Sequence, residues 1–225
     1  MKKKNRKYVV TPLLLLLLLV TVGGTVAWLT AKSSVKNSFT VGSFNLPTTD
    51  PTDPTKVKEQ TQFLDEPSWV SNDPHKLLPG VTYDKDPYVG IGKGSEDAVV
   101  YVYVKNAFTK NGANSVYFTI NDGWEAVSNT VSGAGGTGSY VSGLFKYTAG
   151  LTNAANADVW TTKPLFSEIV VSNNAKSTDF EIAEGFDEGA ITVESFIHQA
   201  KDGEGKAISD TEVILPAAKT AFGIN

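Results

Sequence analysis

The hydrophobic pattern along most of this chain is that of β-strands. The clearest strand covers 98–105, where β-branched and aromatic residues occupy both faces. An apolar run without alternation predicts a central strand that is covered on both sides, or one whose outer face packs against a neighbour. Further strands are predicted at 116–120, 140–147, 165–171, 179–183 and 190–199.

The C-terminal part adds an unusual strand and a short helix. Strand 190–199 has polar and apolar residues on both faces, which indicates an edge or inter-sheet strand whose outer face is partly covered. Residues 209–212 resemble the start of a helix, and Pro216 suits a first helical position. We therefore predict an all-β, antiparallel fold that ends in a short helical segment at 217–222.

A separate strand is predicted near the N-terminus, at 35–46. Its apolar residues lie on one parity before Gly42 and on the other after it, which suggests a β-bulge that returns them to one side. Three prolines with threonine and aspartate follow in 47–55. This composition predicts a semi-rigid, extended linker over 47–60 that separates the strand from the rest of the domain. The apolar residues of the strand are Val35, Phe39, Val41, Phe44 and Leu46.

The N-terminus has the three parts of a secretory signal peptide. Five basic residues lie within 2–7, an apolar run follows at 9–22, and small residues occupy Thr25 and Ala27. We predict cleavage between Ala27 and Trp28. The apolar run is at the low end of the ~17–25 residues that span a bilayer, so an uncleaved anchor is the alternative. The expected organisation is a signal peptide at 1–27, an N-terminal arm at 28–46, the linker at 47–60 and a β-domain at 61–225.

The residues around the predicted cleavage site carry a family resemblance. Residues 23–27 read Gly-Gly-Thr-Val-Ala, Trp28 follows, and 37–42 read Asn-Ser-Phe-Thr-Val-Gly. This pattern resembles the TasA/camelysin-like family of Gram-positive bacteria, whose exported members are processed by a SipW-type signal peptidase. The resemblance is strongest over 1–46. It implies a secreted protein of the cell surface or biofilm matrix, with a jelly-roll-like antiparallel β-sandwich that polymerises into fibres.

Composition is that of an acidic, exported domain. Removal of 1–27 takes away five of the 20 lysine and arginine residues and none of the 24 aspartate and glutamate residues. This leaves 15 against 24, a formal charge of −9. Such a domain repels nucleic acid and anionic lipid, so we expect neither as a partner and a membrane only before cleavage. The chain has no cysteine, so burial rather than disulfide bonds has to stabilise it.

The sequence offers little for catalysis. Its two histidines, His75 and His198, are not part of an H-E-x-x-H pair, although camelysin-like relatives have been called metallopeptidases. A G-x-S-x-G elbow for nucleophilic hydrolysis is also missing. The glycine-rich loop 133–138 is followed by strand-like residues and not by the helix that a phosphate-binding loop needs. We therefore predict no catalytic residues.

Two kinds of binding site are left open. Carboxylates near 81–98 and in the acidic segment 179–188 offer oxygen ligands for calcium, the one cofactor considered, but neither has EF-hand spacing. The four tryptophans, Trp28 among them, offer stacking surfaces for carbohydrate, but a cysteine-free β-domain also needs large aromatics in its core. The calcium candidates are Asp84, Asp86, Glu96 and Asp97.

The leading functional hypothesis is a structural fibre subunit. After cleavage, an apolar arm that begins at Trp28 is free to add to the sheet edge of the next subunit, where main-chain hydrogen bonds give affinity. Head-to-tail addition produces an open filament when the rotation does not close. In the isolated monomer, the alternative is that the arm completes its own sheet. The alternative functions are a secreted adhesin, or glycan- or matrix-binding module, and a camelysin-type metallopeptidase. The expected partners are other copies of the chain, the signal peptidase and other matrix proteins.

Overall fold

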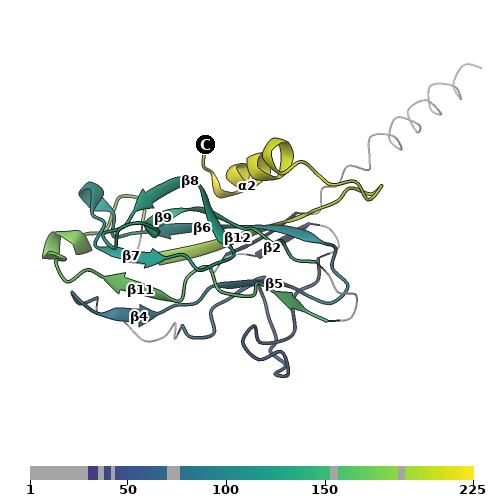
Figure 1. The fold of residues 1–225 in the computed structure, drawn as a ribbon, viewed down its shortest axis with the longest axis horizontal. Coiled ribbons are helices and arrows are strands. Elements are labelled where there is room, and N and C mark those ends of the chain that lie inside the picture. The colour runs from purple at the N-terminus through teal and green to yellow at the C-terminus, as the bar shows by residue number, and fades with distance from the viewer. Residues whose placement is uncertain (1–29, 35–37, 42–43, 70–76, 153–156, 187–190) are drawn as a thin grey trace, which may run out of the picture.

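The fold is antiparallel β with one short C-terminal α-helix (Figure 1), as the hydrophobic pattern predicts. A computed structural model describes residues 30–34, 38–41, 44–69, 77–152, 157–186 and 191–225, and for 30–34 and 38–41 it describes the backbone only. Within these ranges, no helix has the length and hydrophobicity needed to cross a membrane.

The larger sheet has nine strands, and six of them form a strongly curled part in the order β2-β1-β12-β6-β9-β8. Each strand runs antiparallel to its neighbours. Strand β6 is the apolar run that the sequence predicts to be central, and it does lie between β12 and β9. The strands are β1 (Thr30–Ser34), β2 (Ser38–Val41), β6 (Ala98–Asn106), β8 (Trp124–Ser132), β9 (Ser139–Tyr147) and β12 (Ile191–Gln199).

Shorter strands form a second layer, and in Figure 1 β4, β11 and β5 lie below the layer of β6, β9 and β12. Phe118 stacks on Phe166 with 4.3 Å between ring centroids, and Phe145 meets Phe118 edge-on at 5.6 Å, so aromatic rings fill much of the core. Strands β7 (Val116–Thr119), β11 (Glu168–Val171) and β4 (Thr82–Asp84) continue from the start of β9, whereas β10 (Val159–Trp160), β5 (Tyr88–Ile91) and β3 (Leu64–Asp65) form a separate three-stranded sheet.

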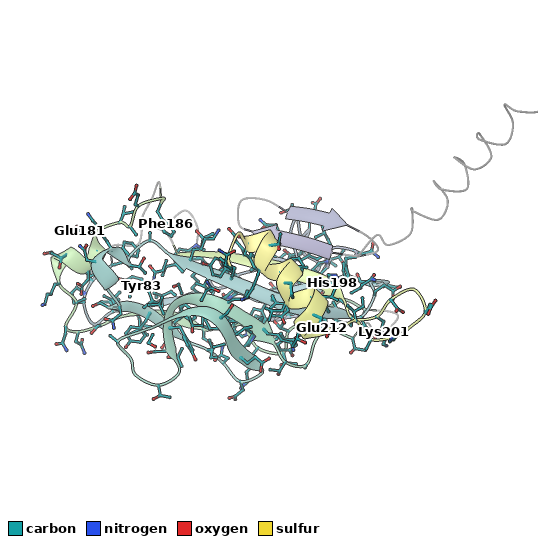
Figure 2. The ribbon with its side chains drawn as sticks, turned by 90° about the horizontal axis from the view of Figure 1, so that it is seen from above. Tyr83, Glu181, Phe186, His198, Lys201 and Glu212 are labelled. Carbon is teal, nitrogen blue, oxygen red and sulfur yellow. The ribbon has the colours of Figure 1, made fainter. Side chains whose placement is uncertain are left out.

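The helix α2 (Leu215–Phe222) covers the outer face of the large sheet, as Figure 2 shows. Alternate side chains of β6 therefore enter different apolar clusters. Val100 and Val102 belong to the main core, whereas Tyr101 packs with Phe196 of β12 and Phe222 of α2. This double burial explains why β6 is apolar on both faces.

The start of α2 agrees with the sequence prediction. A π-helical turn (Asp210–Ile214) precedes the helix, and the Ser209 hydroxyl accepts a hydrogen bond from the Glu212 N–H at 3.3 Å. Pro216 lies in the first helical turn, where its missing N–H has no partner to lose. The helix ends at Gly223, whose φ of 69° is left-handed and suits glycine.

Three differences from the sequence prediction concern β12, residues 179–183 and β8. Strand β12 is not an edge, because it lies between β1 and β6, although its outer face is covered as expected. Residues 179–183 contain no strand. A 3-10 turn (Ser177–Phe180) forms there, because the Asp179 carboxylate accepts hydrogen bonds from the Lys176 N–H and the Ser115 hydroxyl. Strand β8 is absent from the prediction because most of its residues are polar and exposed.

Candidate assembly edge

Two strands of the N-terminal arm, at 30–34 and 38–41, lie on the edge of the chain's own sheet. Strand β1 pairs with β12 in register from Thr30 opposite His198 to Ser34 opposite Glu194, and β2 pairs with the other side of β1. Within the predicted strand 35–46, residues 38–41 do form a strand, β2, whereas 44–46 do not, and β1 at 30–34 is a further strand that the prediction lacks. The small and polar side chains of 30–34 carry no strand pattern. Phe39 and Val41 lie in β2, whereas Val35, Ala27 and Trp28 lie outside the described residues.

The two ends of the curled sheet differ in regularity. At one end, the pairing of β8 with β9 has three register shifts, and Asn129 adopts a positive φ of 53°. Such bulges disrupt the ladder that an incoming strand would need. At the other end, β12 pairs with β6 over nine residues without a shift. If the arm left, β12 would present a regular edge, so it is the better template for strand addition.

Phe44 marks the end of the arm and the beginning of the body. Its side chain is 4% exposed and belongs to the main core, and Leu46 packs against that core. The Asn45 N–H donates to Ser95 Oγ at 2.9 Å, and the Gly92 N–H donates to the Asn45 carbonyl at 2.7 Å. A Cβ at Gly92 would lie 2.1 Å from the Leu46 carbonyl oxygen, so only glycine permits this approach. The sequence pattern places Phe44 and Leu46 in the assembly strand, and in the single chain described here both are anchored in the body.

The segment 47–60 is folded onto the body, so the prediction of an extended linker is wrong here. One Asp158 carboxylate oxygen accepts hydrogen bonds from the Thr48 N–H and from the Thr48 and Thr49 hydroxyls, and the other accepts the Lys93 N–H at 2.9 Å. Residues 49 and 57 also form a β-bridge. Within the segment, Asp50 and Asp53 each accept an N–H two residues ahead, which folds the chain into turns.

Replacing Asp158 with asparagine is expected to cost about 1–2 kcal/mol at neutral pH, because the hydrogen bonds that hold 48–49 and Lys93 weaken. Burial disfavours the charged form of Asp158, but these hydrogen bonds outweigh it and lower the pKa. The stabilisation is therefore present above the unfolded-state pKa of about 3.9 and is lost as the pH falls through the lower, folded-state value. Urea unfolding as a function of pH measures the effect.

A matched control is Glu59→Gln, which removes one negative charge from an exposed residue of the same segment. We expect that variant to follow the wild type at every pH. If both variants converged on the wild type at neutral pH, Asp158 would contribute nothing to holding 47–60 in place.

The four calcium candidates do not come together in the structure. Among the described residues, no group of three or more histidine, aspartate or glutamate side chains is placed to hold a metal ion. Asp86 is buried and accepts hydrogen bonds from the Ser68 N–H and hydroxyl, both at 2.8 Å, and burial raises its pKa. Asp97 pairs with Lys201 at 2.7 Å. Asp84 and Glu96 are exposed.

The histidine and tryptophan residues that are described serve the fold. His198 is 1% exposed in β12, its Nδ1 lies 2.8 Å from the Gln199 carbonyl, and burial lowers its pKa. The Trp124 indole N–H donates to the Lys163 carbonyl, and that of Trp160 donates to the Thr49 hydroxyl. Trp69 covers the amine of Lys85. His75 and Trp28 lie outside the described residues.

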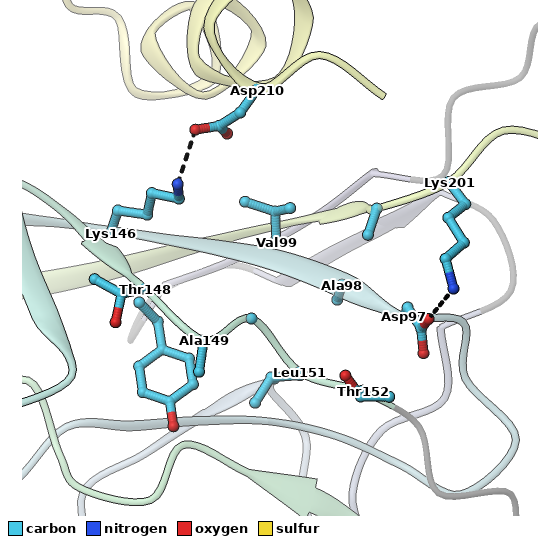
Figure 3. A pocket seen from close by; sticks show the side chains of 13 residues that line it. Asp97, Ala98, Val99, Lys146, Thr148, Ala149, Leu151, Thr152, Lys201 and Asp210 are labelled. Atoms are coloured by element: carbon cyan, nitrogen blue, oxygen red, sulfur yellow. Dashed lines mark hydrogen bonds and ion pairs between the residues drawn. The ribbon is translucent and has the colours of Figure 1, made fainter. Parts of the chain in front are cut away.

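A pocket of about 360 Å³ opens where β6 begins (Figure 3). Two ion pairs line it, with Nζ–Oδ2 distances of 2.9 Å for Lys146–Asp210 and 2.7 Å for Lys201–Asp97. The sequence does not reveal this grouping, because its members come from four separate segments. In each pair a lysine is matched by an aspartate, so the charges at the sides of the pocket balance. Comparison of the chain with protein-family models, with curated proteins and with solved structures found no match.

Proposed function

We propose that this protein is a secreted structural subunit of biofilm-matrix or cell-surface fibres, similar to the TasA/camelysin-like proteins, with a jelly-roll-like sandwich as its body. Subunits assemble when the N-terminal arm of one copy pairs with β12 of the next. The observation that carries the proposal is the contrast between the arm and the body. The arm pairs along β12, which would be a regular edge strand without it, whereas the chain from Phe44 onward is anchored in the core.

Exchange of the arm keeps the same main-chain hydrogen bonds. Strand β1 meets five residues of β12, and an identical arm from another copy can make the same five pairs. The exchange therefore changes the number of molecules joined and not the number of bonds made. Because donor and acceptor surfaces differ, each added subunit leaves a new free arm or a new free edge. A chain of such contacts grows into a filament when the rotation between subunits does not close.

Cleavage of the signal peptide determines where and when the subunits assemble. While residues 1–27 hold the precursor at the membrane, the arm is tethered at its N-terminal side. A SipW-type signal peptidase that cuts after Ala27 frees it outside the cell. The charge of −9 on the mature chain favours solubility until the arms find their edges and gives no attraction to nucleic acid.

Replacing Phe39 and Val41 with aspartate is expected to abolish fibres. Both residues have the same parity in β2, so the double variant places two charges on one face of the arm. The body should stay folded, because its core begins at Phe44. Electron microscopy of the purified mature protein detects fibres, and circular dichroism and thermal unfolding report on the body.

The matched control is Thr55→Asp with Val57→Asp, which adds the same two charges to exposed positions of 47–60. We expect this variant to form fibres like the wild type. A Phe39/Val41 variant that unfolds outright would show that the arm belongs to the core of its own domain. A variant that still forms fibres would rule out the arm as the donor.

A further inference from the structure

Lys85 and Glu66 form the most deeply buried ion pair among the described residues. The Lys85 Nζ lies 2.7 Å from Glu66 Oε2, and the two side chains are 4% and 9% exposed. Glu66 follows β3 and Lys85 precedes β5, and these two strands are paired, so the fold holds both residues in place. A buried ion pair is costly, because the desolvation of two charges often exceeds their attraction.

The surroundings of the pair favour uncharged groups. The second carboxylate oxygen, Glu66 Oε1, is buried and has no hydrogen-bond partner among the described residues. The Trp69 ring covers the amine, with its centroid 4.5 Å from Lys85 Nζ. Burial raises the pKa of Glu66, and the nearby Asp86 and Asp65 carboxylates raise it further, against the opposing effect of Lys85. A carboxylate with an unpaired oxygen is the least stable form that Glu66 can take at this position.

We infer that Lys85 and Glu66 join in an intramolecular amide bond. A proton first passes from the Lys85 ammonium to Glu66 Oε2 along their hydrogen bond, which gives a neutral amine and a neutral carboxylic acid. The amine lone pair then attacks the carboxyl carbon of Glu66. The new carbon–nitrogen bond forms, the bond from that carbon to Oε2 breaks, and Oε2 leaves as water with two of the three ammonium protons. The orphaned Oε1 becomes the amide carbonyl oxygen.

The fold holds the amine and the carboxyl group close together, which favours a condensation that is slow between free groups in water. The carboxyl carbon is at most one carbon–oxygen bond further from Nζ than Oε2 is, so the reacting atoms are already close to a near-attack arrangement. Groups held in this way react with effective concentrations of about 10⁵–10⁸ M. The product removes both buried charges and links two segments covalently. In a chain without cysteine, this cross-link fills the role that a disulfide bond has in other exported proteins.

Mass spectrometry of the purified protein tests the inference directly. We expect the intact mass to be one water molecule lower than the mass calculated for the residues that the purified protein contains. Trypsin cuts after lysine but not after an acylated lysine, so it should release residues 59–76 joined to residues 77–93 as one branched peptide. Fragmentation of this peptide should locate the bond between Glu66 and Lys85. An intact mass equal to the calculated mass of the purified residues, with 77–85 released as a free peptide, overturns the inference.

The chain contains its own control in the ion pair Lys105–Glu194, which has a similar distance of 2.8 Å but a lysine side chain that is 35% exposed. There we expect ordinary cleavage after Lys105 and a free peptide 94–105. The variant Lys85→Met should restore the full mass and lower the unfolding temperature. If a mass deficit of one water persisted in Lys85→Met, the dehydration would lie elsewhere and the assignment to Lys85 would be wrong.

Discussion

Replacing Phe44 with alanine is expected to lower the free energy of unfolding by about 3–5 kcal/mol, the range measured for truncation of a buried phenylalanine. The side chain is 4% exposed in the main core, so its removal leaves a cavity. The loss also loosens the neighbouring anchors, since Asn45 bonds to Ser95 and to the Gly92 N–H. Urea unfolding followed by tryptophan fluorescence measures the change.

The informative comparison is with Phe39→Ala in β2. If the arm ends before Phe44, Phe39→Ala weakens fibre formation and leaves the unfolding of the monomer almost unchanged. Phe44→Ala does the reverse at low protein concentration, because it destabilises the body itself. A Phe44→Ala protein that is as stable as the wild type but forms no fibres would show that Phe44 belongs to the donated strand.

The centre of the fold can be predicted from the sequence, because buried positions there carry apolar side chains. The run 98–105 is apolar on both faces, and the structure covers both faces of β6, one with the main core and one with α2. The start of α2 is equally local, since Ser209 caps the turn three residues ahead. In both cases the residues on which the prediction rests are the same residues that make the packing or hydrogen-bond contact.

The errors arise where main-chain pairing or long-range hydrogen bonds decide the structure. Strand β8 is polar, and its partner β9 holds it without the help of an apolar pattern. The composition of 47–60 is that of a linker, but Asp158, more than a hundred residues away, accepts hydrogen bonds from Thr48 and Thr49. No local pattern of side chains reveals such a partner.

The candidate assembly edge also depends on main-chain pairing between distant segments, so the sequence does not reveal it. A sequence shows that the arm is apolar at Phe39 and Val41, but it does not show that β12 is the strand beside the arm or that β8 is bulged. The ion pair of Lys85 and Glu66 is hidden for a similar reason, because the two residues lie nineteen positions apart and meet only through the pairing of β3 with β5.

Replacing Phe222 with alanine is expected to detach α2 from the sheet. The Phe222 ring lies 5.5 Å from Tyr103 and 6.2 Å from Phe196, centroid to centroid, and its removal costs about 3 kcal/mol of docking energy. Because a C-terminal helix can open without the rest of the domain, the effect should be local. Hydrogen exchange at 215–222 should become about a hundredfold faster, while exchange in the core strands stays slow.

The matched control is Thr220→Ala, which truncates an exposed residue of the same helix. Its hydroxyl donates to the Pro216 carbonyl within that helix, so we expect α2 to stay docked. The Phe222 variant should also bind more of a dye that recognises apolar surface, since Tyr101 and Phe196 lose their cover. Fibres that still form with the same appearance would place the subunit contact at the β12 edge alone. Global unfolding of the Phe222 variant would instead show that α2 is an integral part of the domain.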